Sequence, residues 1–224
     1  MKSGFDIGIS ISLERNEFVI EQSDENGVIS RKNISPASFM ACIANSCAEN
    51  EIQKSGVLPM GCIATSISRA KQYYFLRHDA LKADFTYAKT EYAQFPIPRL
   101  VFGFEYQPAI QKVTDYRVCV VPDGSLDSDT VLYKYPFSNV GVSGHICLGN
   151  NALPRYKRPV QLSTLPGYIL RMPNNNDHYD IQSNQKAFQY RDLLEHMKDK
   201  TSAYYYEHIL VESGRTLGQF LEWS

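Results

Sequence analysis

The residues best suited to covalent chemistry lie in one stretch rich in glycine and asparagine, "NVGVSGHICLGNN", at residues 139–151. Its cysteine, Cys147, is closely flanked by Gly144 and Gly149, a composition typical of irregular backbone at a protein surface. A cysteine thiolate in such a place can act as a nucleophile and form a covalent intermediate. His145 can hydrogen-bond the thiol or carry a proton, the alternative being an ordinary loop histidine.

Asn139, eight residues before the cysteine, is the second candidate for catalysis. Its side-chain amide can donate a hydrogen bond to the oxyanion that forms when a thioester carbonyl is attacked, although turn asparagines often bond only to their own loop. Asn150, three residues after the cysteine, is a candidate supporting residue. Asp177 and Asp180, in the irregular segment "PNNNDHYD", would help to deprotonate or orient an incoming amine if their loop reaches the cysteine; solvated carboxylates are the alternative.

Three basic residues, Arg155, Lys157 and Arg158 in "RYKR", follow the cysteine stretch. Positive charge at this place would favour the thiolate form of the cysteine and would offer a docking surface for an acidic partner. A solvated basic loop is the alternative interpretation of the same residues.

The composition indicates a reducing compartment. The five cysteines include no C-x-x-C pair, so the sequence predicts neither a disulfide framework nor a metal site, and nothing in it indicates a cofactor. The stretch "MKSGFDIGISIS" is interrupted by Asp6, and no window holds about 18 consecutive apolar residues, so neither export nor a membrane span is expected. A formal net charge of -1 makes nucleic acid an unexpected partner. We therefore expect a cytoplasmic protein.

The elements that must position these residues begin with strands. Apolar and small or polar residues alternate over residues 5–13, and strands at 18–22 and 28–33 are predicted on either side of Asn26-Gly27, a pair that favours a tight turn. Ser35 followed by Pro36 predicts the start of a helix of about three to four turns.

A second antiparallel meander is expected before the cysteine stretch, with strands at residues 62–68, 72–76, 99–106 and 113–121. Helical spacing of apolar residues predicts a helix around residues 190–197, and a short apolar helix is predicted at 217–223. The four remaining cysteines lie in periodic segments and are expected to be packed side chains: Cys42, Cys47, Cys62 and Cys119.

The segment "YPFSNVGVSGHICLGN" resembles the active-site segment of ubiquitin-conjugating enzymes, in which a His-Pro-Asn triplet is followed, eight residues after its asparagine, by the catalytic cysteine. Asn139 and Cys147 have that separation, and three neighbours match as well: Gly144, Ile146 and Leu148. Phe137 and Ser138 stand where the histidine and proline would be, so the loop must be held in a different way.

The sequence is more similar to a bacterial branch, the prokaryotic conjugating-enzyme family D, which includes protein B of the PRTRC system. The similarity covers most of residues 35–180 and is carried by "VLPMG", "PRLVFGF", "DTVLYKYPFSNV" and "GHICLGN". It implies an α+β fold in which a four-stranded antiparallel meander packs on helices. Residues 1–34 would form additional antiparallel strands, and residues 35–224 the conjugating-enzyme core, together in one compact unit.

The resemblance also implies a function. Cys147 would accept a ubiquitin-like protein as a thioester from a ThiF-like activating enzyme and pass it to a target nucleophile, with a JAB-type metallopeptidase as a further component of the pathway. Two other classes are open. One is a non-catalytic module of the same fold that binds a ubiquitin-like protein, and the other is a cysteine hydrolase with His145, His178 or His208 as its base.

Overall fold

The computed structural model describes residues 6–12, 17–23, 29–48, 55–68 and 70–223. The chain divides into two compact units, with the division between Lys54 and Ser55. The sequence predicts a boundary after residue 34 within one compact body. The structure instead groups the helix that follows this position with the first unit. The two units are described separately.

The first unit is a three-stranded antiparallel sheet, β1 (Asp6–Ser12), β2 (Glu17–Ser23) and β3 (Ile29–Ile34), followed by helix α1 (Pro36–Ala48). The predicted strands are confirmed over the described residues, whereas the predicted Asn26-Gly27 turn lies outside them. The backbone N–H of Ser38 donates to the Ser35 hydroxyl at 3.1 Å, which confirms the predicted N-cap. The Phe39 ring packs on Phe18 of β2, with ring centroids 4.9 Å apart, and this contact explains why the helix belongs with the strands.

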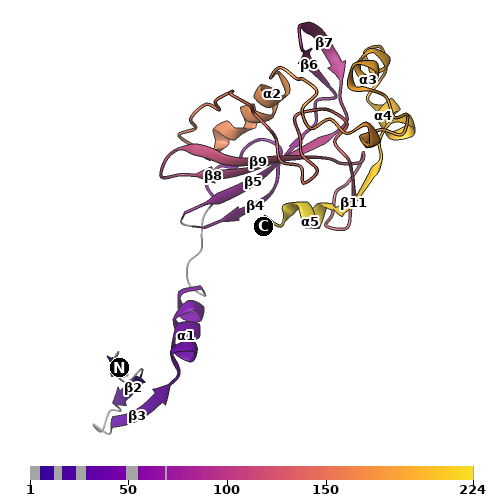
Figure 1. Cartoon of the computed structure of the whole chain (residues 1–224). Helices are drawn as coiled ribbons and strands as arrows, with labels where there is room; N and C mark the ends of the chain where they lie inside the picture. The colour runs from indigo at the N-terminus through magenta and orange to yellow at the C-terminus, as the bar shows by residue number, and fades with distance from the viewer. Residues whose placement is uncertain (1–5, 13–16, 24–28, 49–54, 69, 224) are drawn as a thin grey trace. The chain divides into compact units, whose positions relative to one another are not determined.

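The second unit is built on a six-stranded antiparallel sheet in the order β11-β10-β9-β8-β5-β4 (Figure 1). Four of its strands are the predicted meander: β4 (Cys62–Ile67), β5 (Gln72–His78), β8 (Leu100–Gln107) and β9 (Lys112–Val120). The strands β10 (Val131–Tyr133) and β11 (Glu212–Thr216) were not predicted, nor was a separate hairpin of β6 (Lys82–Tyr87) and β7 (Thr90–Pro96). The predicted α+β class and meander are confirmed.

Apolar side chains on both faces of this sheet are buried, because residues alternate between the faces along each strand. Tyr74, Phe102 and Val118 belong to the larger core, which also includes residues from α2 (Leu165–Leu170), α3 (Tyr190–Met197) and α4 (Ala203–His208). Phe75 and Val101 belong to a smaller core on the opposite face, closed by α5 (Leu217–Leu221). A strand buried on both faces tends to be apolar along its length, as the first half of β8, "LVFGF", is.

The helices of the second unit confirm two predictions. The predicted stripe on α3 is entirely buried: Tyr190, Leu193, Leu194 and Met197. α5 forms where a short apolar helix is expected, and it begins with a capping box between Thr216 and Gln219. The sequence analysis missed α2, α4 and two short 3-10 helices, Pro159–Thr164 and Ile181–Ser183. Across the described ranges, no helix combines the length and apolarity that crossing a membrane requires.

Candidate active site: the cysteine hairpin

Residues 139–147 form a short antiparallel hairpin, which we call the cysteine hairpin. The Cys147 N–H donates to the Asn139 carbonyl at 2.7 Å, and the Gly141 N–H donates to the His145 carbonyl at 2.9 Å. Val140 pairs with Ile146 between these two bonds. The interval of eight residues therefore has a geometric meaning, because it places Asn139 directly opposite Cys147 across the hairpin.

The second arm of the cysteine hairpin runs along strand β9. The Ile146 N–H donates to the Tyr116 carbonyl at 3.0 Å, and the Val118 N–H donates to the Gly144 carbonyl at 2.9 Å. Gly144 has a φ of 88°, and a Cβ at this position would lie 2.9 Å from the Val118 carbonyl oxygen. Only glycine satisfies both the left-handed backbone and this close approach to the sheet.

Phe137 and Ser138, the two departures from the His-Pro-Asn pattern, anchor the start of the cysteine hairpin. The Phe137 side chain is buried among four aromatic rings, with centroid distances of 5.2 to 6.2 Å: Phe85, Phe95, Tyr135 and Tyr205. The buried Ser138 hydroxyl donates to the Asn174 side-chain carbonyl at 3.2 Å. An aromatic plug, the Phe137 ring among its four neighbours, and a buried hydrogen bond thus hold the start of the cysteine hairpin.

A loop formed by residues 173–177 supports Asn139 from the other side. The Asn139 side-chain amide donates to the Pro173 carbonyl at 3.2 Å, and its backbone N–H donates to the Asp177 carbonyl at 2.8 Å. Asn139 has a φ of 61°, a left-handed conformation that asparagine tolerates better than most residues. One hydrogen of the amide is engaged with Pro173, and the second is available to a ligand.

The same loop is fixed to the β6–β7 hairpin. The Asn174 N–H donates to the Thr86 carbonyl at 2.7 Å, and the Ala88 N–H donates to the Asn174 carbonyl at 2.9 Å. The sequence analysis missed Asn174, although the run of three asparagines after Pro173 was a signal for a hydrogen-bonded loop. The loop therefore transmits the position of the β6–β7 hairpin to the asparagine of the site.

Cys147 is exposed, while its neighbours Ile146 and Leu148 are both buried. This alternation follows from extended backbone, which turns the thiol outward as the adjacent side chains enter the core. Of the other cysteines with described side chains, Cys119 is buried and Cys62 is half-buried, and burial raises the pKa of both thiols. The predicted packing of these two is confirmed, and the side chains of Cys42 and Cys47 lie outside the description.

The pKa of the neighbouring Tyr116 is raised, first by burial and then by its electrostatic interactions with Asp115 and Cys147. The His145 Nδ1 lies 2.9 Å from a carboxylate oxygen of Asp115 on β9. Within the described ranges, no histidine nitrogen forms a hydrogen bond with the Cys147 sulfur. The structure therefore holds His145 against the sheet.

The acidic candidates lie at different distances from the site residues. Asp177 reaches the cysteine hairpin through its backbone carbonyl, and its exposed carboxylate accepts a hydrogen bond from the Asn175 side chain at 2.7 Å. The Asp180 carboxylate instead accepts from the Gln182 N–H and lies 3.9 Å from the Lys134 ammonium group. Only Asp177 belongs to the loop that contacts Asn139.

The basic candidates surround a buried tyrosine. The Tyr156 N–H donates to the Gln111 carbonyl at 3.0 Å, and the Tyr156 carbonyl accepts from the Tyr106 hydroxyl at 2.8 Å. Three basic side chains and Asn150 are exposed along this segment: Arg155, Lys157, Arg158 and Asn150. The anchored tyrosine fixes the backbone between the charges, so the basic group has a defined place on the second unit.

The fold and the site define a class of protein. A four-stranded antiparallel meander with accompanying helices, followed by an exposed cysteine opposite an asparagine, is the arrangement of the E2, or ubiquitin-conjugating, type. The family model for prokaryotic E2 family D matches residues 38–212, which is more than half of the chain. The chain belongs to this family, as the sequence analysis predicts.

No curated protein and no solved structure gives a significant match to the chain. The family match supports an E2-like protein of the conjugating-transferase class, which works in general with a ubiquitin-like protein and an activating enzyme.

Proposed function

We propose that Cys147 carries a ubiquitin-like protein as a thioester. The Cys147 thiolate attacks the thioester that links the C-terminal carbonyl carbon of the ubiquitin-like protein to the cysteine of a ThiF-like activating enzyme. A C–S bond to Cys147 forms, and the activating enzyme's thiolate leaves. An amine of the target then attacks the same carbon, an amide forms, the Cys147 thiolate is released and the amine loses a proton. A JAB-type metallopeptidase would act in the same pathway.

The observation that carries the proposal is the pairing of the exposed Cys147 with Asn139 across the cysteine hairpin. A carbonyl bound to the thiol would lie beside the asparagine, whose second amide hydrogen is available to stabilise the oxyanion. Because a thioester is already activated, positioning and oxyanion stabilisation are sufficient for transfer. Asn139 is thus the proposed oxyanion donor.

Two neighbouring groups have proposed supporting roles. Asp177 would accept the proton of the incoming amine, since its loop contacts Asn139 and its carboxylate is exposed. Arg155, Lys157 and Arg158 would bind an acidic surface of a partner protein. His145 would support the hairpin through Asp115 rather than the chemistry, and the lack of a hydrogen bond from its ring to the Cys147 sulfur within the described residues argues against a cysteine hydrolase that uses His145 as its base.

The test is a charging reaction with the cognate ThiF-like enzyme, the ubiquitin-like protein and ATP, followed by gels run with and without reducing agent. The proposal predicts an adduct that reducing agent removes. The adduct should be lost in Cys147→Ala and kept in Cys62→Ala, the matched control. Failure of the wild-type protein to form an adduct with partners of verified activity would refute catalysis and favour the binding-module alternative.

A further inference from the structure

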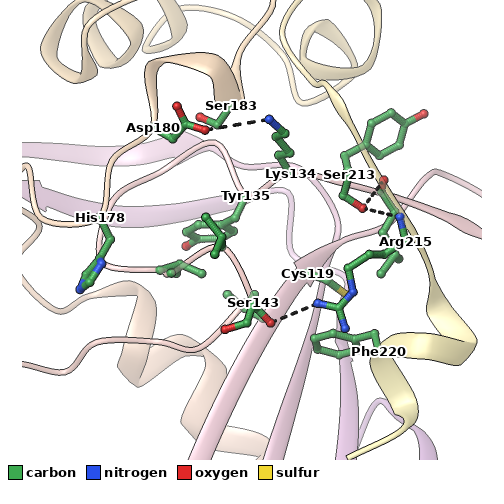
Figure 2. A pocket seen from close by; sticks show the side chains of 17 residues that line it. Cys119, Lys134, Tyr135, Ser143, His178, Asp180, Ser183, Ser213, Arg215 and Phe220 are labelled. Carbon is green, nitrogen blue, oxygen red and sulfur yellow. Dashed lines mark hydrogen bonds and ion pairs between the residues drawn. The ribbon is translucent and has the colours of Figure 1, made fainter. Parts of the chain in front are cut away.

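A cavity of about 260 Å³ lies at the turn of the cysteine hairpin (Figure 2). Its walls are the turn residues 141–144, parts of β9, β10 and β11, and residues from the segment 178–183. Cys147 lines a different and smaller cavity together with Asn139. The cavity at the turn is therefore distinct from the proposed thioester site, and its volume suits a small organic molecule.

The cavity contains more positive than negative charge. The Arg215 guanidinium donates to two backbone carbonyls, Ser143 at 3.3 Å and Gln219 at 3.5 Å, and within the described part of the chain it has no carboxylate partner. The other lining cation, Lys134, lies 3.9 Å from Asp180, which is the sole carboxylate lining the cavity. A guanidinium without a carboxylate partner favours an anionic ligand.

A buried hydroxyl in the cavity wall is also without a partner. Ser183 is 3% exposed, and its Oγ has no hydrogen-bond partner among the residues that the structure describes. Figure 2 shows Ser183 near Lys134 and Asp180, while Arg215 lies beside Ser143 and Phe220. An unpaired buried hydroxyl is costly, so a ligand that bonds to it gains affinity.

The cavity also has apolar walls, formed by Val118, Leu132, Val140 and Phe220. We propose that it binds a small organic anion, a carboxylate or phosphate with an apolar body. The anionic group is held by Arg215, and the apolar body lies on the apolar walls. A second polar group, at the opposite end of the ligand, bonds to Ser183 near Lys134. This site is independent of thioester chemistry at Cys147.

The experiment uses the full chain and phenyl phosphate as the probe, with inorganic phosphate and phenol as controls that each carry half of its chemistry. Binding is measured by calorimetric titration, and the site is located by hydrogen exchange. We expect phenyl phosphate to bind more tightly than either control and to protect residues 141–144 and 178–183. Protection at residues 155–158 instead, or no binding of phenyl phosphate at millimolar concentration, would overturn the proposal.

Variants separate the cavity from the exposed basic segment. Arg215→Gln should weaken phenyl phosphate binding by about tenfold or more, since it removes a charged hydrogen-bond donor. Ser183→Ala should leave phenyl phosphate binding unchanged, since the phenyl end offers no hydrogen bond, but should weaken binding of 4-hydroxyphenyl phosphate by roughly threefold to tenfold without lowering the thermal stability, because the hydroxyl has no bond to lose. Arg155→Gln is the matched control and should bind as the wild type does. Equal affinity of the wild type and Arg215→Gln for phenyl phosphate, or of the wild type and Ser183→Ala for 4-hydroxyphenyl phosphate, would refute the site.

Discussion

Gly144 is the residue whose replacement most directly tests the hairpin geometry. In Gly144→Ala, the alanine must keep the backbone φ of 88°. Its new Cβ lies 2.9 Å from the Val118 carbonyl oxygen. Because that oxygen belongs to the backbone of β9, it cannot rotate away as a flexible side chain would. Either the hairpin arm or the strand must shift.

The expected cost is the sum of two contributions. A left-handed conformation costs an alanine roughly 1–2 kcal/mol. The forced contact adds about 1–3 kcal/mol, since the shift strains packed backbone and weakens the bond from the Val118 N–H to the Gly144 carbonyl. We therefore expect Gly144→Ala to lower the free energy of unfolding of the second unit by about 2–5 kcal/mol.

Gly149→Ala is a matched control in the same region. Gly149 also has a positive φ, 54°, but a Cβ there meets no atom within 4 Å. Its replacement should therefore cost only the conformational contribution, about 1–2 kcal/mol. The difference between the two variants measures the close approach of the hairpin to β9.

The assay is urea unfolding of the full chain followed by tryptophan fluorescence. Trp223, the single tryptophan, packs against Phe75 and lies over the Arg117 guanidinium at 4.5 Å, so its signal reports on the second unit. Equal destabilisation by Gly144→Ala and Gly149→Ala would refute the argument from the contact with β9. A Gly144→Ala protein as stable as the wild type would refute the hairpin register as a whole.

Three further predictions concern the site and its support. Asn139→Ala should slow discharge to an acceptor by about 10²- to 10³-fold while slowing charging much less. Asn139→Gly, which tolerates the φ of 61° at this position, should behave alike. Equal slowing of charging and discharge would count against the oxyanion role. Phe137→Ala should lower the free energy of unfolding by about 3–5 kcal/mol in the Trp223 assay, and a loss below about 1 kcal/mol would contradict the aromatic plug. Burial alone would raise the pKa of Glu105, but hydrogen bonds from Thr114, Lys71 and Gln107 bring it below its ordinary 4.5. The free energy of unfolding should therefore fall as the pH drops from about 4.5 through the lowered pKa. Glu105→Gln should flatten this decline, and an unchanged slope in the variant would contradict the prediction.

Elements whose signals are local in the sequence could be predicted. The N-cap at Ser35, the four meander strands and the buried stripe of α3 each follow from capping chemistry or periodicity within one short segment. The strands β10 and β11 could not be predicted, because they are short and the sequence of β11, "ESGRT", is polar. Their pairing depends on partners far away in the chain.

The candidate site shows the same division. The spacing of Asn139 and Cys147 is visible in the sequence, and the hairpin gives it a physical basis. The support of Ser138 comes from Asn174, 36 residues later, and the carboxylate that holds His145 comes from Asp115, 30 residues earlier. Sequence proximity suggested that His145 serves the cysteine, but the neighbouring strand provides its partner.

The contact between Arg215 and the Ser143 carbonyl has a consequence for synthesis of the protein. These residues are 72 positions apart, so the support behind the hairpin turn arrives only after β11 has left the ribosome. A nascent chain from which Cys147 has emerged but Arg215 has not yet emerged lacks the hydrogen bond from Arg215 to the Ser143 carbonyl. The turn of the cysteine hairpin is therefore supported only once folding of the second unit has brought β11 beside it.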